Sequence, residues 1–309
     1  MTASRTAQYV ALYRALENSE MRREPLFCDP FAATFLDPTL RRALRLSRFR
    51  LLRGLLERYA DYRAPGARTS AIGRTRFIDD VVRRAALDGS RQLVVLGAGF
   101  DCRAHRLAEL ADSRIFEVDR PETQERKRVE VARANDLRPR DDVRYVAVDF
   151  LVDDLGERLT AAGWSRDERS TFVWEGVSNY LSEEAVSKLL GWIGRAAPGS
   201  CLVFTYIHRG VLDGSERFEG ADLLMRNVRA LGEPWRFGLQ PEAVASFLEG
   251  FGLRLEGDVG ADEYRRRYPA LAASGMRGYA FYRIAVARVG PPLLQAHAPL
   301  RQQASERSP

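Results

Sequence analysis

The sequence predicts an α/β fold with a doubly wound, mostly parallel sheet, and three observations support this prediction. Short apolar runs alternate with helical stretches between residues 92 and 206. Four consecutive runs end in a glycine or an acidic residue. The chain has 309 residues, 45% of them hydrophobic, which is enough to form a substantial core. Strands that alternate with helices form βαβ units, and such units build parallel sheets.

The apolar runs have the length and composition of strands that are buried on both faces. They occupy residues 92–96, 113–118, 143–148, 171–174 and 200–206, and two later runs lie near 253–257 and 279–287. Helices are expected between them, for example over residues 122–134 and 182–197. The first five runs therefore predict five consecutive strands of one sheet.

The N-terminal region, residues 1–90, is predicted to be mostly helical. Apolar residues recur there at helical spacing, first at Val10, Tyr13 and Leu16 and again at Leu44, Phe49, Leu52 and Leu55. Asp29-Pro30 and Asp37-Pro38 have the pattern of helix starts, because aspartate caps a helix and proline fits its first turn. A last helix, near residues 69–87, leads into the sheet.

The chain is thus expected to have three parts. An N-terminal helical region covers residues 1–90, and an α/β domain covers residues 91–289. Within that domain, the glycine-rich segment at about 207–245 interrupts the alternation and is expected to form a cap over the substrate. Residues 290–309 are rich in Pro, Gln, Ser and Arg and are expected to be disordered.

The composition disfavours several classes of function. The net charge is a mild +6 and the basic residues are spread along the chain, which is not the pattern of a nucleic-acid-binding protein. The three cysteines lack C-x-x-C spacing, so neither a disulfide framework nor a metal site is expected. No apolar run approaches the roughly 20 residues of a membrane helix, and no signal peptide is recognisable. We therefore expect a cytoplasmic protein with no membrane partner.

The residues at the ends of the predicted strands indicate a ligand site. Ligands of open α/β sheets bind outside the carboxyl ends of the strands, and four runs end at Gly97, Asp119, Asp149 and Glu175. The turn Gly97-Ala98-Gly99 allows close approach of a ligand to the backbone. An acidic residue about 20 positions later can accept hydrogen bonds from ribose hydroxyls. These residues favour a nucleotide-like cofactor.

Other interpretations of the same residues remain open. Glycine turns after strands are common, and an acidic residue there can simply cap a helix. A nicotinamide-dependent oxidoreductase is disfavoured, because Cys102 stands where the G-x-G-x-x-G pattern needs its third glycine. A protein that binds the cofactor without catalysis is a further alternative. Asp149 and Phe150 could contact an adenine, and Glu175 could contact a cation.

The sequence resembles the leucine carboxyl methyltransferase-like family of S-adenosylmethionine (SAM)-dependent O-methyltransferases. The stretches FEVDRP at 116–121 and EGVSNYL at 175–181 are the most specific. Further matches lie at 29–32, 95–101, 103–107 and 148–150, and the resemblance extends from about residue 7 to 287. It implies a Rossmann-like, seven-stranded class I methyltransferase sheet with an antiparallel last strand and an N-terminal helical addition.

The resemblance also implies roles for individual residues. It assigns Gly97, Ala98 and Gly99 to the turn that faces SAM and Asp119 to the ribose. It assigns Asp149 and Phe150 to the adenine, Glu175 to the methionine end and Arg74 to the SAM carboxylate. Arg14 is a hypothetical further contact. Two departures, Cys102 for the usual Thr and His105 for a frequent aromatic residue, could alter the floor of the pocket.

The methyl acceptor is predicted to be an oxygen nucleophile, with a carboxylate favoured. A carboxylate is ionised at neutral pH and needs no base, whereas a phenol or alcohol, the alternative acceptor, requires one. Tyr180, Tyr206 and His208 are the candidates for orienting the acceptor or acting as that base. Phe218, Trp235 and Phe237 are expected to shape the acceptor pocket. The expected acceptor is a small molecule, such as a metabolite of natural product biosynthesis, or a peptide C-terminus, and the protein is expected to be a monomer or homodimer.

Overall fold

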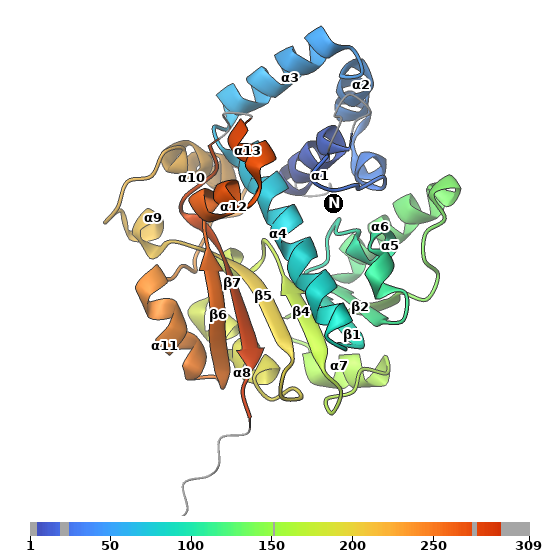
Figure 1. Ribbon diagram of the computed structural model, residues 1–309, viewed down its shortest axis with the longest axis vertical. Helices are drawn as coiled ribbons and strands as arrows, with labels where there is room; N and C mark the ends of the chain where they lie inside the picture. Colours follow the sequence, from blue (N-terminus) through green and yellow to red (C-terminus); the bar gives the residue numbers. More distant parts are fainter. Residues whose placement is uncertain (1–4, 19–24, 151, 274–276, 292–309) are drawn as a thin grey trace, which may run out of the picture.

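The computed structural model describes residues 5–18, 25–150, 152–273 and 277–291, and its centre is a seven-stranded sheet (Figure 1). The strand order is β3-β2-β1-β4-β5-β7-β6, and β7 is antiparallel to both of its neighbours. The strands are β1 (Gln92–Leu96), β2 (Arg114–Asp119), β3 (Arg144–Ala147), β4 (Ser170–Trp174), β5 (Cys201–Ile207), β6 (Leu253–Val259) and β7 (Tyr282–Val289). The predicted fold class is confirmed.

The α-helices cover both faces of the sheet and extend beyond it at one end. They are α1 (Arg5–Glu17), α2 (Pro38–Leu46), α3 (Arg50–Arg63), α4 (Ala67–Leu87), α5 (Arg103–Arg106), α6 (Pro121–Arg133), α7 (Leu155–Ala161), α8 (Glu183–Ile193), α9 (Arg209–Asp213), α10 (Ala221–Ala230), α11 (Val244–Glu249), α12 (Ala261–Arg267) and α13 (Pro269–Ala273). Short 3₁₀ helices include η1 (Ala32–Phe35), η2 (Ala108–Leu110), η3 (Asn135–Leu137), η4 (Ser178–Tyr180) and η5 (Pro241–Ala243). None of the described helices is long and apolar enough to cross a membrane.

The sheet is buried on both faces because successive residues of a strand point to opposite sides. On β1, Val94 packs into the core under α8, whereas Val95 packs into the core under α4. Every residue of β1, β4 and β5 is buried. This explains why these strands appear in the sequence as continuous apolar runs rather than alternating ones.

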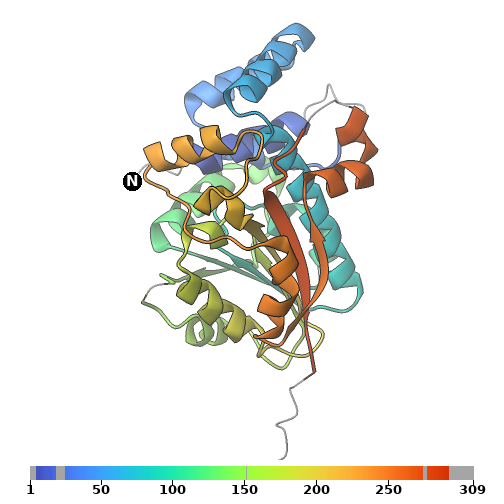
Figure 2. The ribbon, with the colours of Figure 1, turned by 90° about the vertical axis from the view of Figure 1, so that its left-hand side faces the viewer.

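The chain reverses its direction of travel across the sheet next to β1. From β1 it proceeds through β2 to β3 on one side, and then returns to β4 and β5 on the other. Such a switch point opens a crevice outside the carboxyl ends of the two central strands. Helix α1 packs against α4 and η1, and Figures 1 and 2 show α1, α2 and α3 together at one end of the molecule, opposite the end where β7 finishes. The N-terminal helices thus lie towards the end of the sheet where the crevice opens.

Local sequence signals account for several element boundaries. Asp37 caps α2, and its carboxylate accepts the backbone N–H groups of Thr39 and Leu40 at 2.8 Å. Asp29 differs from the expectation, because it accepts the N–H of Ala32 and begins the short η1 instead of an α-helix. Residues 207–245 contain α9, α10 and η5, and α11 begins within them. Residues 292–309 of the tail that is predicted to be disordered lie outside the described residues.

Candidate functional site at the carboxyl ends of β1, β2 and β4

The turn after β1 requires glycine at its first position. Gly97 has a φ of +67°, in the left-handed region. A Cβ atom at this position would lie 2.4 Å from Cγ2 of Val177, in the segment after β4. Gly99, with a φ of +45°, has more space around it, since the nearest atom to its Cβ position is 3.8 Å away. The turn therefore brings bare backbone to the switch point.

Asp119, at the end of β2, is held against this turn by its carboxylate. Its Oδ2 accepts the backbone N–H of Gly99 at 2.6 Å, and its Oδ1 accepts the N–H of Arg120 at 2.7 Å. Burial raises the pKa of Asp119, and these two hydrogen bonds oppose that rise. A carboxylate offers about four acceptor sites, so each oxygen retains capacity for one more donor. This arrangement can bind a vicinal diol.

Glu175 and Arg74 form a charge pair beside the same turn. Arg74 projects from α4, and its Nε donates to Glu175 Oε1 at 3.2 Å. The guanidinium also lies over the ring of Tyr282, at 4.2 Å from the ring centre. Arg74 is 7% exposed, and the pKa of its side chain is raised, because Tyr282 and Glu175 beside it outweigh the opposing effect of burial. An adjacent anion and cation can together bind a ligand that carries both an ammonium and a carboxylate group.

Arg103, which the sequence reasoning did not single out as functional, fixes the other oxygen of Glu175. Its Nη2 donates to Glu175 Oε2 at 3.0 Å, its Nε donates to Asp79 at 2.8 Å, and its Nη1 pairs with Asp101. The side chain is 1% exposed. In so arginine-rich a chain it is not distinctive, and its place four residues after the glycine turn is the only signal in the sequence.

Arg14, the hypothetical further contact with SAM, binds the backbone just after the glycine turn. Its Nη2 donates to the carbonyl oxygen of Phe100 at 2.6 Å, and its Nε lies 3.4 Å from Oδ2 of Asp29. Asp29 is also within 3.8 Å of Arg106, which pairs with Asp79. Arg14 thus supports the turn through a buried set of charge pairs that continues to Arg103.

Asp149 and Phe150 follow β3 at the same end of the sheet. The backbone N–H of Asp149 donates to Asp153 at 2.8 Å, which shapes the loop. Both side chains are partly exposed, and Phe150 packs against the core on the α8 side. Since Ala147 of β3 pairs with Asp119 of β2, these two residues lie at the edge next to the ribose candidate.

Tyr206 and His208, two of the three catalytic candidates, are held by other protein groups. The hydroxyl of Tyr206 donates to Asp258 at 2.7 Å and accepts from Arg283 at 3.1 Å, in the core on the sheet face opposite α4. His208 caps α9, since its Nδ1 accepts the N–H of Gly210 at 3.1 Å. The structure therefore does not bring Tyr206 to the face of Arg74 and Glu175.

Tyr180, the third candidate, lies in the aromatic cluster next to the charge pair. It packs with Trp235 and Tyr282, and Tyr282 lies under the guanidinium of Arg74. Burial raises the pKa of Tyr180 to about 12, so its hydroxyl is neutral at physiological pH. Phe218 belongs to the same cluster, but Phe237 does not, since it packs with Phe247 in the core on the α8 side.

The cap segment is tied to the loop after β4 by Asn179, which the sequence reasoning also missed. Its carbonyl oxygen accepts the backbone N–H of Arg236 at 2.7 Å. The side chain of Asn179 is buried beside Tyr180. This contact joins the loop that carries Glu175 to the segment that carries Trp235.

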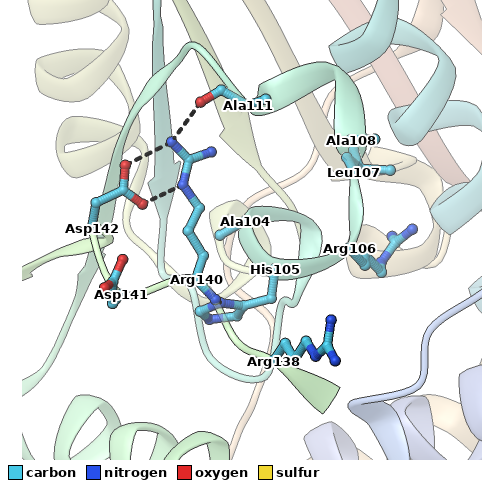
Figure 3. Close-up of a pocket in the computed structure, with 10 residues that line it drawn as sticks. All are labelled: Ala104, His105, Arg106, Leu107, Ala108, Ala111, Arg138, Arg140, Asp141 and Asp142. Atoms are coloured by element: carbon cyan, nitrogen blue, oxygen red, sulfur yellow. Dashed lines mark hydrogen bonds and ion pairs between the residues drawn. The ribbon is translucent and has the colours of Figure 1, made fainter. Parts of the chain in front are cut away.

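His105 and Cys102 lie away from the charge pair. His105 lines a separate cavity of about 500 Å³, with Arg138, Arg140 and Asp142 (Figure 3). Figure 3 shows the Arg140 side chain turned towards Asp142 and the carbonyl group of Ala111, so its guanidinium is already engaged. Cys102 is buried in the core formed with α1 and η1. Within the described ranges, no cluster of three or more His, Cys, Asp or Glu residues could hold a metal ion.

Comparison with known proteins shows the family of this chain. Residues 7–194 match the family described as leucine carboxyl methyltransferase. A Frankia alni protein provisionally named an S-adenosyl-L-methionine-dependent methyltransferase is 38% identical over 202 residues, which cover 65% of this chain and 68% of that one. A second, similarly named F. alni protein is 34% identical over 252 residues, 81% and 82% of the two chains.

A solved structure supports the fold. The crystal structure of a duf574 family protein from Streptomyces avermitilis aligns with a TM-score of 0.57 and 18% identity, over 92% of this chain and 97% of that one. At this level of identity the likeness concerns the fold alone. The family match over residues 7–194, together with the F. alni relatives, shows that the chain belongs to the leucine carboxyl methyltransferase family.

Proposed function

We propose that this protein transfers a methyl group from SAM to a carboxylate oxygen and so forms a methyl ester. As a member of its family, the chain is a SAM-dependent methyltransferase. The oxygen acceptor and its class, a small metabolite or a peptide C-terminus, are our proposal.

The residues at the strand ends fit SAM in three places. The bare turn at Gly97 admits the cofactor close to the backbone. The carboxylate of Asp119 has acceptor capacity for the ribose diol. The pair of Glu175 and Arg74 complements the ammonium and carboxylate groups of the methionine part. We assign Asp149 and Phe150, at the adjoining edge, to the adenine.

The observation that carries the choice of acceptor is that none of the three candidates is suited to act as a base. Tyr206 is bound to Asp258, and His208 caps α9 through its Nδ1. The pKa of Tyr180, raised to about 12, makes a phenolate base unavailable near neutral pH. A carboxylate needs no base, because it is already ionised, whereas an alcohol or phenol must lose a proton.

SAM supplies an electrophilic methyl group on a sulfonium, so the protein mainly has to position the acceptor. In this proposal Tyr180, whose hydroxyl is neutral, donates a hydrogen bond to the acceptor carboxylate. Trp235, Phe218 and Phe281 form the apolar cluster next to it, which would shield an acceptor bound there from water. Orientation of this kind can contribute roughly 7–11 kcal/mol to lowering a bimolecular barrier.

The test compares carboxylic acids with phenols of matched shape as acceptors of the labelled methyl group of SAM. We expect label in a product that mild alkali hydrolyses, which is the behaviour of a methyl ester. Label that survives alkali, obtained from the phenols alone, would contradict the proposal. Tyr180→Phe should lower kcat/KM for the acid about tenfold, the equivalent of one hydrogen bond, and leave the affinity for SAM unchanged.

A further inference from the structure

Helix α3 exposes an apolar stripe that no described part of the chain covers. Leu51 and Tyr62 are 84% and 80% exposed, and Leu55 and Tyr59 between them are also exposed. These positions follow one another at intervals of four, four and three residues, so they share one face of the helix. Leu46 and Phe49, just before α3, are exposed as well. A row of exposed apolar side chains along one helix face is typical of an interaction site.

Helices α2 and α3, with the short turn between them, carry an excess of positive charge. Residues 38–63 contain eight arginines and two acidic residues, a net charge of +6, equal to the formal net charge of the whole chain. Seven of these arginines are exposed, and none of the seven forms an ion pair with a described residue; they are Arg41, Arg42, Arg45, Arg48, Arg50, Arg58 and Arg63. This charge is available to a partner.

The two acidic residues of the segment do not offset that charge at the surface. Glu57 lies 2.9 Å from the buried Arg53 and 3.6 Å from the buried Arg68. Asp61 pairs with Arg68 at 2.7 Å. Both carboxylates are therefore neutralised by arginines that point into the protein, and the outer surface remains basic.

The α2–α3 pair stands at the periphery of the fold. Helix α2 has no fully buried residue, and Arg53 is the only one in α3. Figures 1 and 2 both show the pair at one end of the molecule, beyond α1. A surface in this position can meet a flat partner without obstruction from the sheet domain.

We propose that the α2–α3 pair docks on an anionic lipid bilayer, with the stripe from Leu51 to Tyr62 in the interfacial region. An amphipathic helix with leucines and aromatic residues beside arginines has the composition that lies in the plane of such an interface. The arginines then meet lipid phosphates, which attract each basic residue near the surface. The absence of a spanning helix, on which the expectation of no membrane partner rests, does not bear on this peripheral contact.

The positive charge of this surface favours an anionic bilayer over a second copy of the chain as its partner. A two-fold contact between copies would place this basic surface against itself, and like charges juxtaposed in an interface oppose association. A bilayer with anionic lipid supplies the opposite charge and the apolar layer together.

Vesicle flotation with the full-length protein tests the proposal. We expect at least about tenfold stronger partitioning to vesicles of about 70% phosphatidylcholine and 30% phosphatidylglycerol than to pure phosphatidylcholine, and weaker binding as salt increases. Leu51→Glu/Leu55→Glu and, separately, Arg42→Glu/Arg45→Glu should each abolish the preference. The controls Leu87→Glu/Val129→Glu and Arg226→Glu/Arg229→Glu change exposed residues elsewhere and should bind as the parent protein does.

The melting temperature and the SAM affinity are expected to be unchanged in all four variants. A loss of vesicle binding is then an effect of the substituted surface and not of misfolding. Equal partitioning to both vesicle types, or binding that Leu51→Glu/Leu55→Glu leaves intact, overturns the proposal. So does sedimentation velocity that shows a dimer in the parent protein and a monomer in that variant, because the stripe would then be an interface between copies. Binding of an acidic protein to the stripe, without binding to vesicles, also overturns the proposal.

Discussion

Asp119 Oδ2 accepts the backbone N–H of Gly99 at 2.6 Å across twenty residues of the chain. The bond joins the end of β2 to the turn after β1, two elements that the parallel sheet already places side by side. The side chain assigned to the ribose is therefore oriented by the same turn that admits the cofactor. Loss of this carboxylate should affect binding more than folding, because the β1–β2 backbone pairing remains.

Asp119→Asn should weaken SAM binding about 100-fold or more, because hydrogen bonds to a charged group contribute roughly 1.5–3 kcal/mol each and the ribose offers two. Isothermal titration calorimetry measures the change. Asp112→Asn, at an exposed position in the preceding loop, is the control and should bind SAM as the parent does. Equal affinities of the two variants would refute the ribose assignment.

The fold could be predicted from the sequence further than the site could. The run at 92–96 matches β1 in full, because its apolar residues Leu93 to Leu96 are buried on both faces and the glycine turn follows them directly. The later strands shift by up to three residues, as at β7, which begins at Tyr282 and not at 279. There Tyr279 and Phe281 belong to the aromatic cluster around Tyr180, and in the sequence these aromatic residues resemble those of a strand.

The site was less predictable because its charge pairs join distant segments. Arg74 and Glu175 are 101 positions apart, and Arg103 and Glu175 are 72 apart. No local pattern distinguishes a buried arginine from the many exposed ones. The same ambiguity affects Phe49, Leu52 and Leu55, whose helical spacing resembles that of core residues although all three are exposed.

Gly97→Ala should destabilise the protein by roughly 2–5 kcal/mol, the sum of left-handed backbone strain and a clash with Val177. Gly99→Ala has only the strain and should cost roughly 1–2 kcal/mol. Urea denaturation gives both values. Val177→Ala combined with Gly97→Ala should recover part of the loss, since Cγ2 of Val177 is removed. Identical effects of the two alanine variants would contradict this account of the turn.

Arg103→Met should destabilise the fold by about 3–5 kcal/mol, because the buried Asp79 and the mostly buried Asp101 and Glu175 would then have less compensating charge. Arg288→Met removes a partly exposed pair with Glu256 and should cost less than about 1 kcal/mol. Arg103→Lys keeps the charge but loses the planar fork, and should fall between them. A cost for Arg103→Met as small as that for Arg288→Met would show that the buried charges do not depend on Arg103.

His105 should make the stability pH-dependent in acid. Burial, and next the charge of Lys127, lower its pKa from 6.5 to about 4, and its neutral Nδ1 accepts the N–H of Arg140 at 3.2 Å. Between pH 4 and 6.5 the unfolded chain therefore binds a proton that the folded one does not. Stability from this group is complete above pH 6.5 and declines as the pH falls to about 4, by at most about 3 kcal/mol.

His105→Phe should remove that part of the pH dependence. The new ring can pack against Phe31, whose ring centre lies 5.3 Å from that of His105, so the fold should be retained. The N–H of Arg140 loses its acceptor, which adds a pH-independent cost of about 1 kcal/mol. The free energy of unfolding, measured by denaturation at several pH values from 4 to 7, should then fall less steeply with decreasing pH for the variant than for the parent. The same pH dependence in both proteins would mean that His105 is protonated equally in the folded and unfolded states, and that burial does not hold it neutral.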